Sequence, residues 1–218
     1  LYVAISDEYY ETTISNGNLE GIYECIAGLR KPEEVILQSP DVKNLWLLPS
    51  SIDLVAADTE LPKLENAHHV MKRIVDAVRE RFDYIFIDCP PALSKNTYNA
   101  LVAASKILIP VQMEALSVKG VSEVLSVMDE VKEFHMNDNL ELLGLLPVMV
   151  DERTKITKQL SKLLGEKHGD LILPCRIRRS VKFLEAQAHG QSIFEYAPYS
   201  STGIDYEIAI KRMFNIKI

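Results

Sequence analysis

The carboxylate of Asp88 is the side chain whose setting in this sequence most clearly suggests chemistry. It follows four apolar residues, 84–87 (Tyr-Ile-Phe-Ile), and a Cys-Pro-Pro sequence comes directly after it. Such a run between breakers is typical of a strand buried on both faces of a parallel sheet. Asp88 would then stand at the strand's carboxyl end, where open α/β sheets bind ligands, and could hold Mg²⁺ beside bound phosphates. From these residues alone, an ordinary strand that stops at an Asp-Cys-Pro turn explains the pattern equally well.

A phosphate-binding loop that would complete such a site does not occur in the sequence. The pattern Gly-x-x-x-x-Gly-Lys-Ser/Thr would supply backbone N–H groups and a lysine for the phosphates. None of the nine glycines is followed by lysine, and neither a Gly-x-Gly-x-x-Gly loop nor a serine nucleophile elbow is found. Hydrolytic chemistry carried by these 218 residues alone therefore has no motif to support it.

Positive charge gathers in one part of an otherwise acidic chain. The formal net charge is −7, yet residues 151–182 have a local charge of +5. Such a concentration suggests a surface for nucleic-acid phosphates. A solvated helix face followed by a basic turn is the alternative. The segment holds four acidic residues and nine basic ones: Arg153, Lys155, Lys158, Lys162, Lys167, Arg176, Arg178, Arg179 and Lys182.

The elements that must position these residues alternate along the chain. Short apolar runs typical of strands are separated by stretches with apolar residues at helical spacing. The alternation predicts an α/β fold, a doubly wound and mostly parallel sheet with helices on both faces, in a single domain over 1–218. The expected strands are 45–48, 84–87, 107–111, 142–150 and 171–173, and the expected helices are 64–82, 118–134, 154–164 and 203–214.

Composition narrows the class of protein. Hydrophobic residues make up 47% and charged residues 25% of the chain, as in ordinary soluble proteins. The three cysteines are far apart and show no zinc-site spacing, which favours a reduced, intracellular protein. No apolar stretch is long enough for a membrane span, and the acidic start does not resemble a targeting signal. The first residue is not methionine, which suggests that the chain begins inside a longer protein.

Five segments, in order, resemble the ParA/Soj group of partition ATPases, relatives of MinD. Residues 82–93 resemble the family's Walker B strand and switch II turn. The family's closing pattern is matched by Glu185-Ala186, His189-Gly190, Tyr196-Ala197-Pro198 and Ser200. The other three matches are 49–54 (Pro-Ser-Ser-Ile-Asp-Leu), 109–114 (Ile-Pro-Val-Gln-Met-Glu) with Gly120, and 151–154 (Asp-Glu-Arg-Thr).

The resemblance implies a P-loop NTPase-like fold and an ATP-dependent switch for DNA partition. In this family ATP and Mg²⁺ promote a homodimer, the dimer binds DNA without sequence preference, and a ParB-like partner stimulates hydrolysis. The protein would then be cytoplasmic and associated with the nucleoid, without stable membrane insertion, and would help to position a chromosome, a plasmid or another cargo.

The resemblance also implies site residues. Asp88 would be the catalytic-site carboxylate, would hold Mg²⁺ through water, and would sense the nucleotide together with Cys89 and Pro90. The segments Met149-Val150 and Arg179-Ser180 would approach the adenine. Three basic residues match or neighbour the family's DNA contacts: Arg153, Arg178 and Lys182.

Departures from the family pattern leave alternatives open. Arg178-Arg179-Ser180 stands where the family commonly has Pro-Arg-Asn, and the family's P-loop and switch I segments have no counterpart. We therefore expect an ATPase whose N-terminal strand and phosphate cradle lie outside these residues, so that the chain alone is inactive. The alternatives are a noncatalytic ParA-like protein that binds DNA or a partner, and a MinD-like positioning ATPase, for which the basic and apolar residues 211–218 are a short candidate tail.

Overall fold

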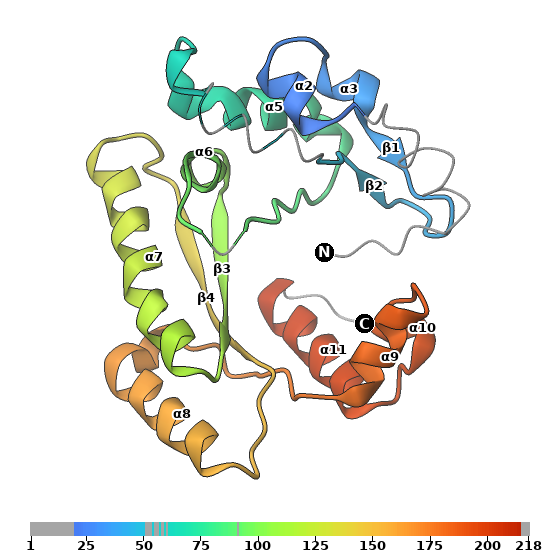
Figure 1. The fold of residues 1–218 in the computed structure, drawn as a ribbon, viewed down its shortest axis with the longest axis vertical. Helices are drawn as coiled ribbons and strands as arrows, with labels where there is room; N and C mark the ends of the chain where they lie inside the picture. Colours follow the sequence, from blue (N-terminus) through green and yellow to red (C-terminus); the bar gives the residue numbers. More distant parts are fainter. Residues whose placement is uncertain are drawn as a thin grey trace. The chain divides into compact units, whose positions relative to one another are not determined.

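The structure is a computed structural model that describes residues 20–50, 54, 57, 59, 61–90 and 92–214. The chain divides into two compact units, whose elements are labelled in Figure 1. Unit 1 contains the described residues up to Ser105 together with Met128–Leu140, and unit 2 contains Lys106–Val127 and the described residues from Glu141 onward. The single domain expected over 1–218 stays a prediction.

Unit 1 is built from short helices around a two-stranded antiparallel hairpin, in which Leu37 pairs with Leu47. Val70, Ile74 and Val78 recur every four residues along one helix and are buried, as their spacing predicts. The helix expected over 64–82 is shorter in the structure, and the strand expected at 45–48 is reduced to two residues. The elements are α2 (Ile22–Ile26), α3 (Pro32–Val35), β1 (Leu37–Gln38), β2 (Trp46–Leu47), α5 (Val70–Val78) and α6 (Lys95–Ala103).

Unit 2 is organised around a parallel pair of strands, β3 and β4, with helices on both of its faces (Figure 1). Its expected strands at 107–111 and 142–150 and its three expected helices are confirmed, with boundaries shifted by a few residues. The elements are β3 (Lys106–Gln112), α7 (Ala115–Glu133), which continues into unit 1, β4 (Glu141–Val148), α8 (Lys155–His168), α9 (Val181–Ala188), α10 (Ile193–Tyr196) and α11 (Ser201–Phe214).

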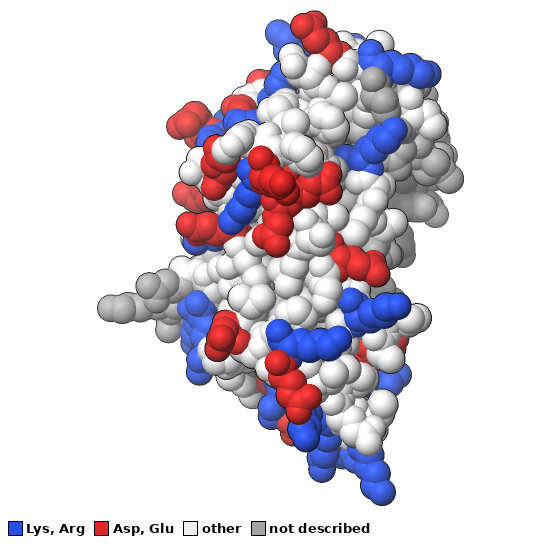
Figure 2. Space-filling view, turned by 90° about the vertical axis from the view of Figure 1, so that its left-hand side faces the viewer, with Lys and Arg blue, Asp and Glu red and all other residues white. Residues whose placement is uncertain are grey.

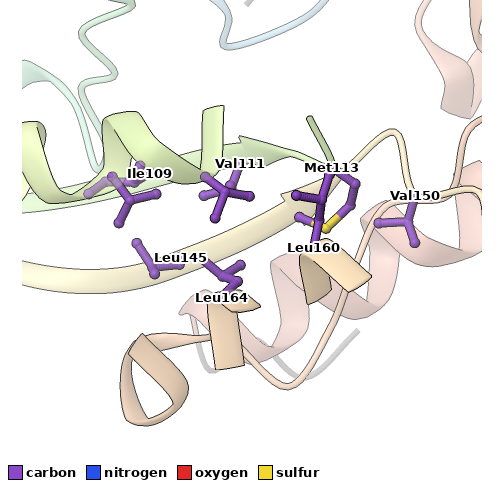
Figure 3. Close-up of a cluster of buried hydrophobic side chains, with 9 residues drawn as sticks. Ile109, Val111, Met113, Leu145, Val150, Leu160 and Leu164 are labelled. Atoms are coloured by element: carbon purple, nitrogen blue, oxygen red, sulfur yellow. The ribbon is translucent and has the colours of Figure 1, made fainter. Parts of the chain in front are cut away.

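Alternating residues of β3 and β4 pack on opposite faces of the pair. Ile109, Val111 and Leu145 face one way and meet Leu160 and Leu164 of α8 in a buried cluster (Figure 3). Their immediate neighbours in sequence contribute to a second cluster, which includes α11. Because side chains alternate along a strand, a single apolar run supplies both layers of the core. This arrangement gives the α/β class that the sequence predicts.

A glycine accommodates an irregularity in the β3–β4 ladder. The register shifts between Ile107 and Leu108, and Leu108 pairs with Gly144, which has a φ of 147°. A Cβ built on Gly144 would lie 2.6 Å from Cγ of Leu173, so only glycine fits there without displacing its neighbour. Leu173 in turn donates from its backbone to Leu145 O over 2.9 Å. The strand expected at 171–173 is thus only a single bridge between Leu145 and Ile172.

The prediction of a strand at residues 84–87 is wrong for this structure. The segment is assigned to neither helix nor strand, and Tyr84, Ile85 and Phe86 are 56%, 39% and 64% exposed. Apolar and β-branched residues favour a strand, but a strand forms only where a neighbouring chain completes its ladder. Within the described residues, no strand pairs with this segment. The buried strand that was expected to end at Asp88 is therefore not formed here.

No helix within the described part of the chain is both long and apolar enough to cross a lipid bilayer.

Candidate functional site

The Asp88 turn lies in unit 1 between the extended residues 84–87 and helix α6. Asp88, Cys89 and Pro90 are all exposed. The hydroxyl of Thr97 donates to Ala92 O over 2.8 Å, and Ser94 Oγ accepts the N–H of Thr97, which caps the first turn of α6. These bonds join the chain just after the turn to a helix start. The structure therefore presents the Asp88 turn at an exposed position in front of a capped helix.

The donor set at Asp88 fits magnesium in one specific way. Mg²⁺ is usually held by one or two carboxylates, with phosphate oxygens and waters completing six ligands. Among the described residues no group of three or more His, Cys, Asp and Glu side chains could hold a metal ion. Asp88 therefore fits a magnesium ion that arrives with phosphates and water, and does not fit a site made of protein ligands alone.

The two segments expected near the adenine lie side by side in unit 2. Val150 N donates to Ile177 O over 3.0 Å, and Arg179 N donates to Val150 O over 3.1 Å. Val150 is buried and uses its backbone in this bridge, whereas Met149 is 53% exposed. Met149 has a φ of 52°, a conformation that costs an ordinary residue about 1–3 kcal/mol and often marks a functional turn. The exposed apolar side chain available to a ligand at this edge is thus that of Met149, beside the exposed Arg179.

Arg153 is held in the turn before α8 by a carboxylate two residues earlier. Its Nε and Nη2 donate to Asp151 at 2.9 and 2.8 Å, and its backbone N–H donates to the same group at 3.1 Å. The hydrogen bonds from Arg153 lower the pKa of Asp151 to about 2, so the carboxylate stays ionised at neutral pH. The Arg153 side chain nevertheless remains 90% exposed. Its unused N–H groups are therefore accessible to an anion.

Arg178 is tied into the fold rather than left at the surface. Its backbone N–H, Nε and Nη2 donate to Asp205 at 2.9, 2.8 and 2.8 Å, and Nη2 also donates to Ser201 O at 3.2 Å. The Arg178 side chain is 42% exposed, while that of Asp205 is only 9% exposed. This pair fixes the turn before α9 against α11, a structural role that the sequence did not reveal.

Lys182 and Ser180 mark the start of α9. Ser180 Oγ accepts the N–H of Lys182 at 3.2 Å and caps the helix. The ammonium of Lys182 forms an ion pair with Glu185 at 2.8 Å, and the side chain of Lys182 is 54% exposed. Arg179, the residue before the cap, is exposed. Among the described residues Arg179 forms no ion pair. Its positive charge helps to lower the pKa of Asp151.

Helix α8 carries exposed lysines that were not among the individual residues predicted from the sequence to contact DNA. Lys155 and Lys158 lie one turn apart and are exposed, and within the described residues neither forms an ion pair. Lys162 continues the row and is 3.7 Å from Glu166. Figure 2 shows lysine and arginine side chains gathered at the height of α8, with a few acids among them. The i, i+3, i+7 spacing of these lysines was the available signal.

Comparison with known proteins places the chain in a family. A family described as an AAA domain matches residues 7–142. Sporulation initiation inhibitor protein Soj of Bacillus subtilis (strain 168) is 36% identical over 165 residues, which are 76% of this chain and 65% of that protein. Chromosome-partitioning ATPase Soj of Treponema pallidum (strain Nichols) is 33% identical over 186 residues, 85% of this chain and 73% of that protein. The chain thus spans less than two thirds of the Bacillus protein's length.

A solved structure shows the same fold. Cobyrinic acid a,c-diamide synthase from Mycobacterium smegmatis, crystallised with ADP and magnesium, superposes with a TM-score of 0.75 over 99% of this chain and 82% of its own. The two sequences are 23% identical, so this likeness speaks for the P-loop NTPase fold and not for a shared reaction. Together with the two Soj proteins, these comparisons show that the chain belongs to the ParA/Soj family of partition ATPases.

Proposed function

We propose that the protein works in ATP-dependent DNA partition, with unit 2 binding the phosphate backbone of DNA without sequence preference. The observation that carries this proposal is the bridge between Val150 and Arg178, because it brings the turn before α8 beside the turn before α9. Arg153 stands in the first turn, and Lys182 lies in the first turn of α9, directly after the second. Two basic turns and the lysine row of α8 in one unit suit contacts to successive phosphates.

The nucleotide proposal rests on the Asp88 turn. Asp88 would hold Mg²⁺ through water, and Cys89 and Pro90 would follow the state of the nucleotide. Met149 would approach the adenine with its side chain, and the backbone around Val150, Arg179 and Ser180 would shape that edge. Bound magnesium would neutralise phosphate charge, while the residues of this chain would orient the nucleotide. ADP and magnesium are present in the structurally similar synthase, which supports a nucleotide and magnesium as the ligands in this proposal.

Family membership supports the remaining parts of the proposal. These are an ATP-bound homodimer, a ParB-like partner that stimulates hydrolysis, and a cytoplasmic, nucleoid-associated location. A noncatalytic DNA- or partner-binding protein is the second candidate. The observation that favours it is the absence of a glycine followed by lysine anywhere in the 218 residues.

ATP hydrolysis by the 218-residue chain tests whether these residues form a complete catalytic site on their own. We expect no turnover above background, because the sequence contains no glycine-lysine phosphate loop. Phosphate release would be measured with Mg-ATP, for the unchanged chain and for Asp88→Ala. Robust turnover that disappears in Asp88→Ala would show that the chain is a complete ATPase and would contradict the noncatalytic candidate.

DNA binding tests the basic surface directly. Arg153→Ala and Lys182→Ala should weaken binding to unrelated DNA duplexes alike, and each should reduce the salt dependence by roughly one phosphate contact. Arg178→Ala should also weaken binding, but its ion pair with Asp205 means that this variant needs a folding check. Lys43→Ala, an exposed lysine of unit 1, is the matched control. A loss confined to one DNA sequence would rule out phosphate contacts.

A further inference from the structure

Lys182 is held by two groups that the proposed function does not use. Its Nζ lies 2.8 Å from Glu185 Oε2, and it stands 5.8 Å over the ring of Tyr196. The Tyr196 hydroxyl donates to the same Glu185 oxygen at 3.1 Å, and the ring of His189 stacks on Tyr196 with centroids 5.3 Å apart. Glu185 and Tyr196 therefore contact the amine that would bind DNA, and His189 packs against the Tyr196 ring.

This contact can open at little cost to the fold. The side chains of Lys182 and Glu185 are 54% and 38% exposed, and exposed pairs three residues apart on a helix contribute little to stability. If Lys182 swings away, Glu185 keeps the hydrogen bond from Tyr196, so its carboxylate is not left without a donor. The Arg178–Asp205 pair differs, because Asp205 is buried and is also bound by the Arg178 backbone.

Glu185 also remains charged under ordinary conditions. The hydrogen bond from Lys182, and then that from Tyr196, lower the pKa of Glu185. An ionised carboxylate beside Lys182 both occupies the ammonium and repels an approaching phosphate. Both effects act against DNA binding through this lysine.

We propose that Glu185 is a built-in competitor of DNA phosphate for Lys182, an autoinhibitory contact that keeps the affinity of the basic surface for DNA low. The inference rests on the proposed DNA-binding function and assigns a regulatory residue to that site. Tyr196 holds Glu185 in position, and the exposed helix start leaves room for a phosphate to take its place.

The size of the effect follows from simple electrostatics. Two unit charges about 4 Å apart in water interact by an energy equivalent to roughly a fivefold change in binding. Removing the charge of Glu185 should therefore tighten DNA binding about fivefold at low salt and steepen the salt dependence by up to about 0.9 in log–log slope. Gln at this position still accepts the hydrogen bond from Tyr196, so the local fold is kept.

The test measures anisotropy of a labelled duplex of arbitrary sequence with the full chain and Mg-ATP, between about 50 and 200 mM salt. Glu185→Gln should bind about fivefold tighter. The matched control is Glu207→Gln, which removes the same charge from a lysine–glutamate pair of 2.5 Å on α11. The control should leave binding within about twofold of the unchanged chain, because Glu207 pairs with Lys211 and not with Lys182.

A double variant identifies the route of the effect. In a Lys182→Ala background, adding Glu185→Gln should give little further tightening, because the lysine that Glu185 restrains is gone. Equal tightening in both backgrounds, or weaker binding by Glu185→Gln alone, would overturn the inference. If the unchanged chain does not bind DNA, the proposed DNA-binding function fails. It also fails if Lys182→Ala binds DNA as tightly as the unchanged chain. If Lys182→Ala weakens binding and Glu185→Gln does not tighten it, the inference alone fails.

Discussion

Arg178 and Asp205 form a two-point ion pair across 27 positions of sequence, with Nε and Nη2 each 2.8 Å from a carboxylate oxygen. The pair joins the turn before α9 to the first half of α11. A residue expected to contact DNA thus also holds together the surface from which such contacts are made.

The first prediction concerns the stability that this pair contributes. Asp205→Asn keeps the shape but removes the charge from a side chain that is only 9% exposed. We expect a loss of about 2–3 kcal/mol in the free energy of unfolding, less than for a fully buried pair because Arg178 is partly exposed. Urea unfolding measures it. Glu207→Gln, from an exposed pair, should lose less than about 1 kcal/mol. Equal losses would contradict a special role for Asp205.

The second prediction is a loss of stability in acid. Burial pushes the pKa of Asp205 upward, but the hydrogen bonds from the Arg178 side chain and backbone outweigh it and leave the pKa below its usual value. A carboxyl group with a lowered folded-state pKa stabilises the protein above the unfolded-state value, and this contribution disappears as the pH falls through the folded-state pKa. Melting temperature should therefore drop below about pH 4, and less steeply in Asp205→Asn. Parallel curves for both proteins would show that Asp205 does not contribute.

The third prediction tests the close approach at Gly144. Gly144→Ala places a Cβ 2.6 Å from Leu173 Cγ on a backbone with a φ of 147°. We expect a loss of about 1–3 kcal/mol in unfolding free energy. Gly165→Ala on α8 is the control, because no atom lies within 4 Å of its added Cβ. That variant should gain about 0.5–1 kcal/mol, since alanine favours a helix over glycine. A harmless Gly144→Ala would mean that the strands shift freely there.

The fourth prediction concerns two thiols of unit 1. Cys25 is buried, and burial, followed by nearby glutamates, raises its pKa to about 11. Cys89 is exposed beside Asp88. Desolvation and the Asp88 carboxylate raise the pKa of Cys89 too, so the predicted difference depends on access more than on acidity. In the native protein iodoacetamide should modify Cys89 well before Cys25, as read by mass spectrometry. In denaturant the two should react alike; equal rates in the native chain would show that Cys25 is not buried.

Local pattern was sufficient for helices α7, α8 and α11 and for the β3–β4 pair. The continuous apolar run of β3 predicted a strand with both faces packed, and Thr154 caps α8 at the position where the expected helix begins. Helix α9, which Ser180 caps, was not expected. The ordered motifs were also sufficient for family membership. These features depend on residues close in sequence, so the sequence by itself determined them.

Tertiary structure decided the features that depend on distant partners. Residues 84–87 have the composition of a buried strand, yet within the described residues no neighbouring strand pairs with them, and Tyr84, Ile85 and Phe86 remain exposed. In the sequence Arg178 and Lys182 look like unpaired cations. In the folded chain Asp205 pairs with Arg178, and Tyr196 holds Glu185 beside Lys182. A strand needs hydrogen bonds from a neighbouring strand, and a cation is available to a ligand only where no counter-ion holds it. In both cases the partner group is distant in sequence and is brought close only by folding.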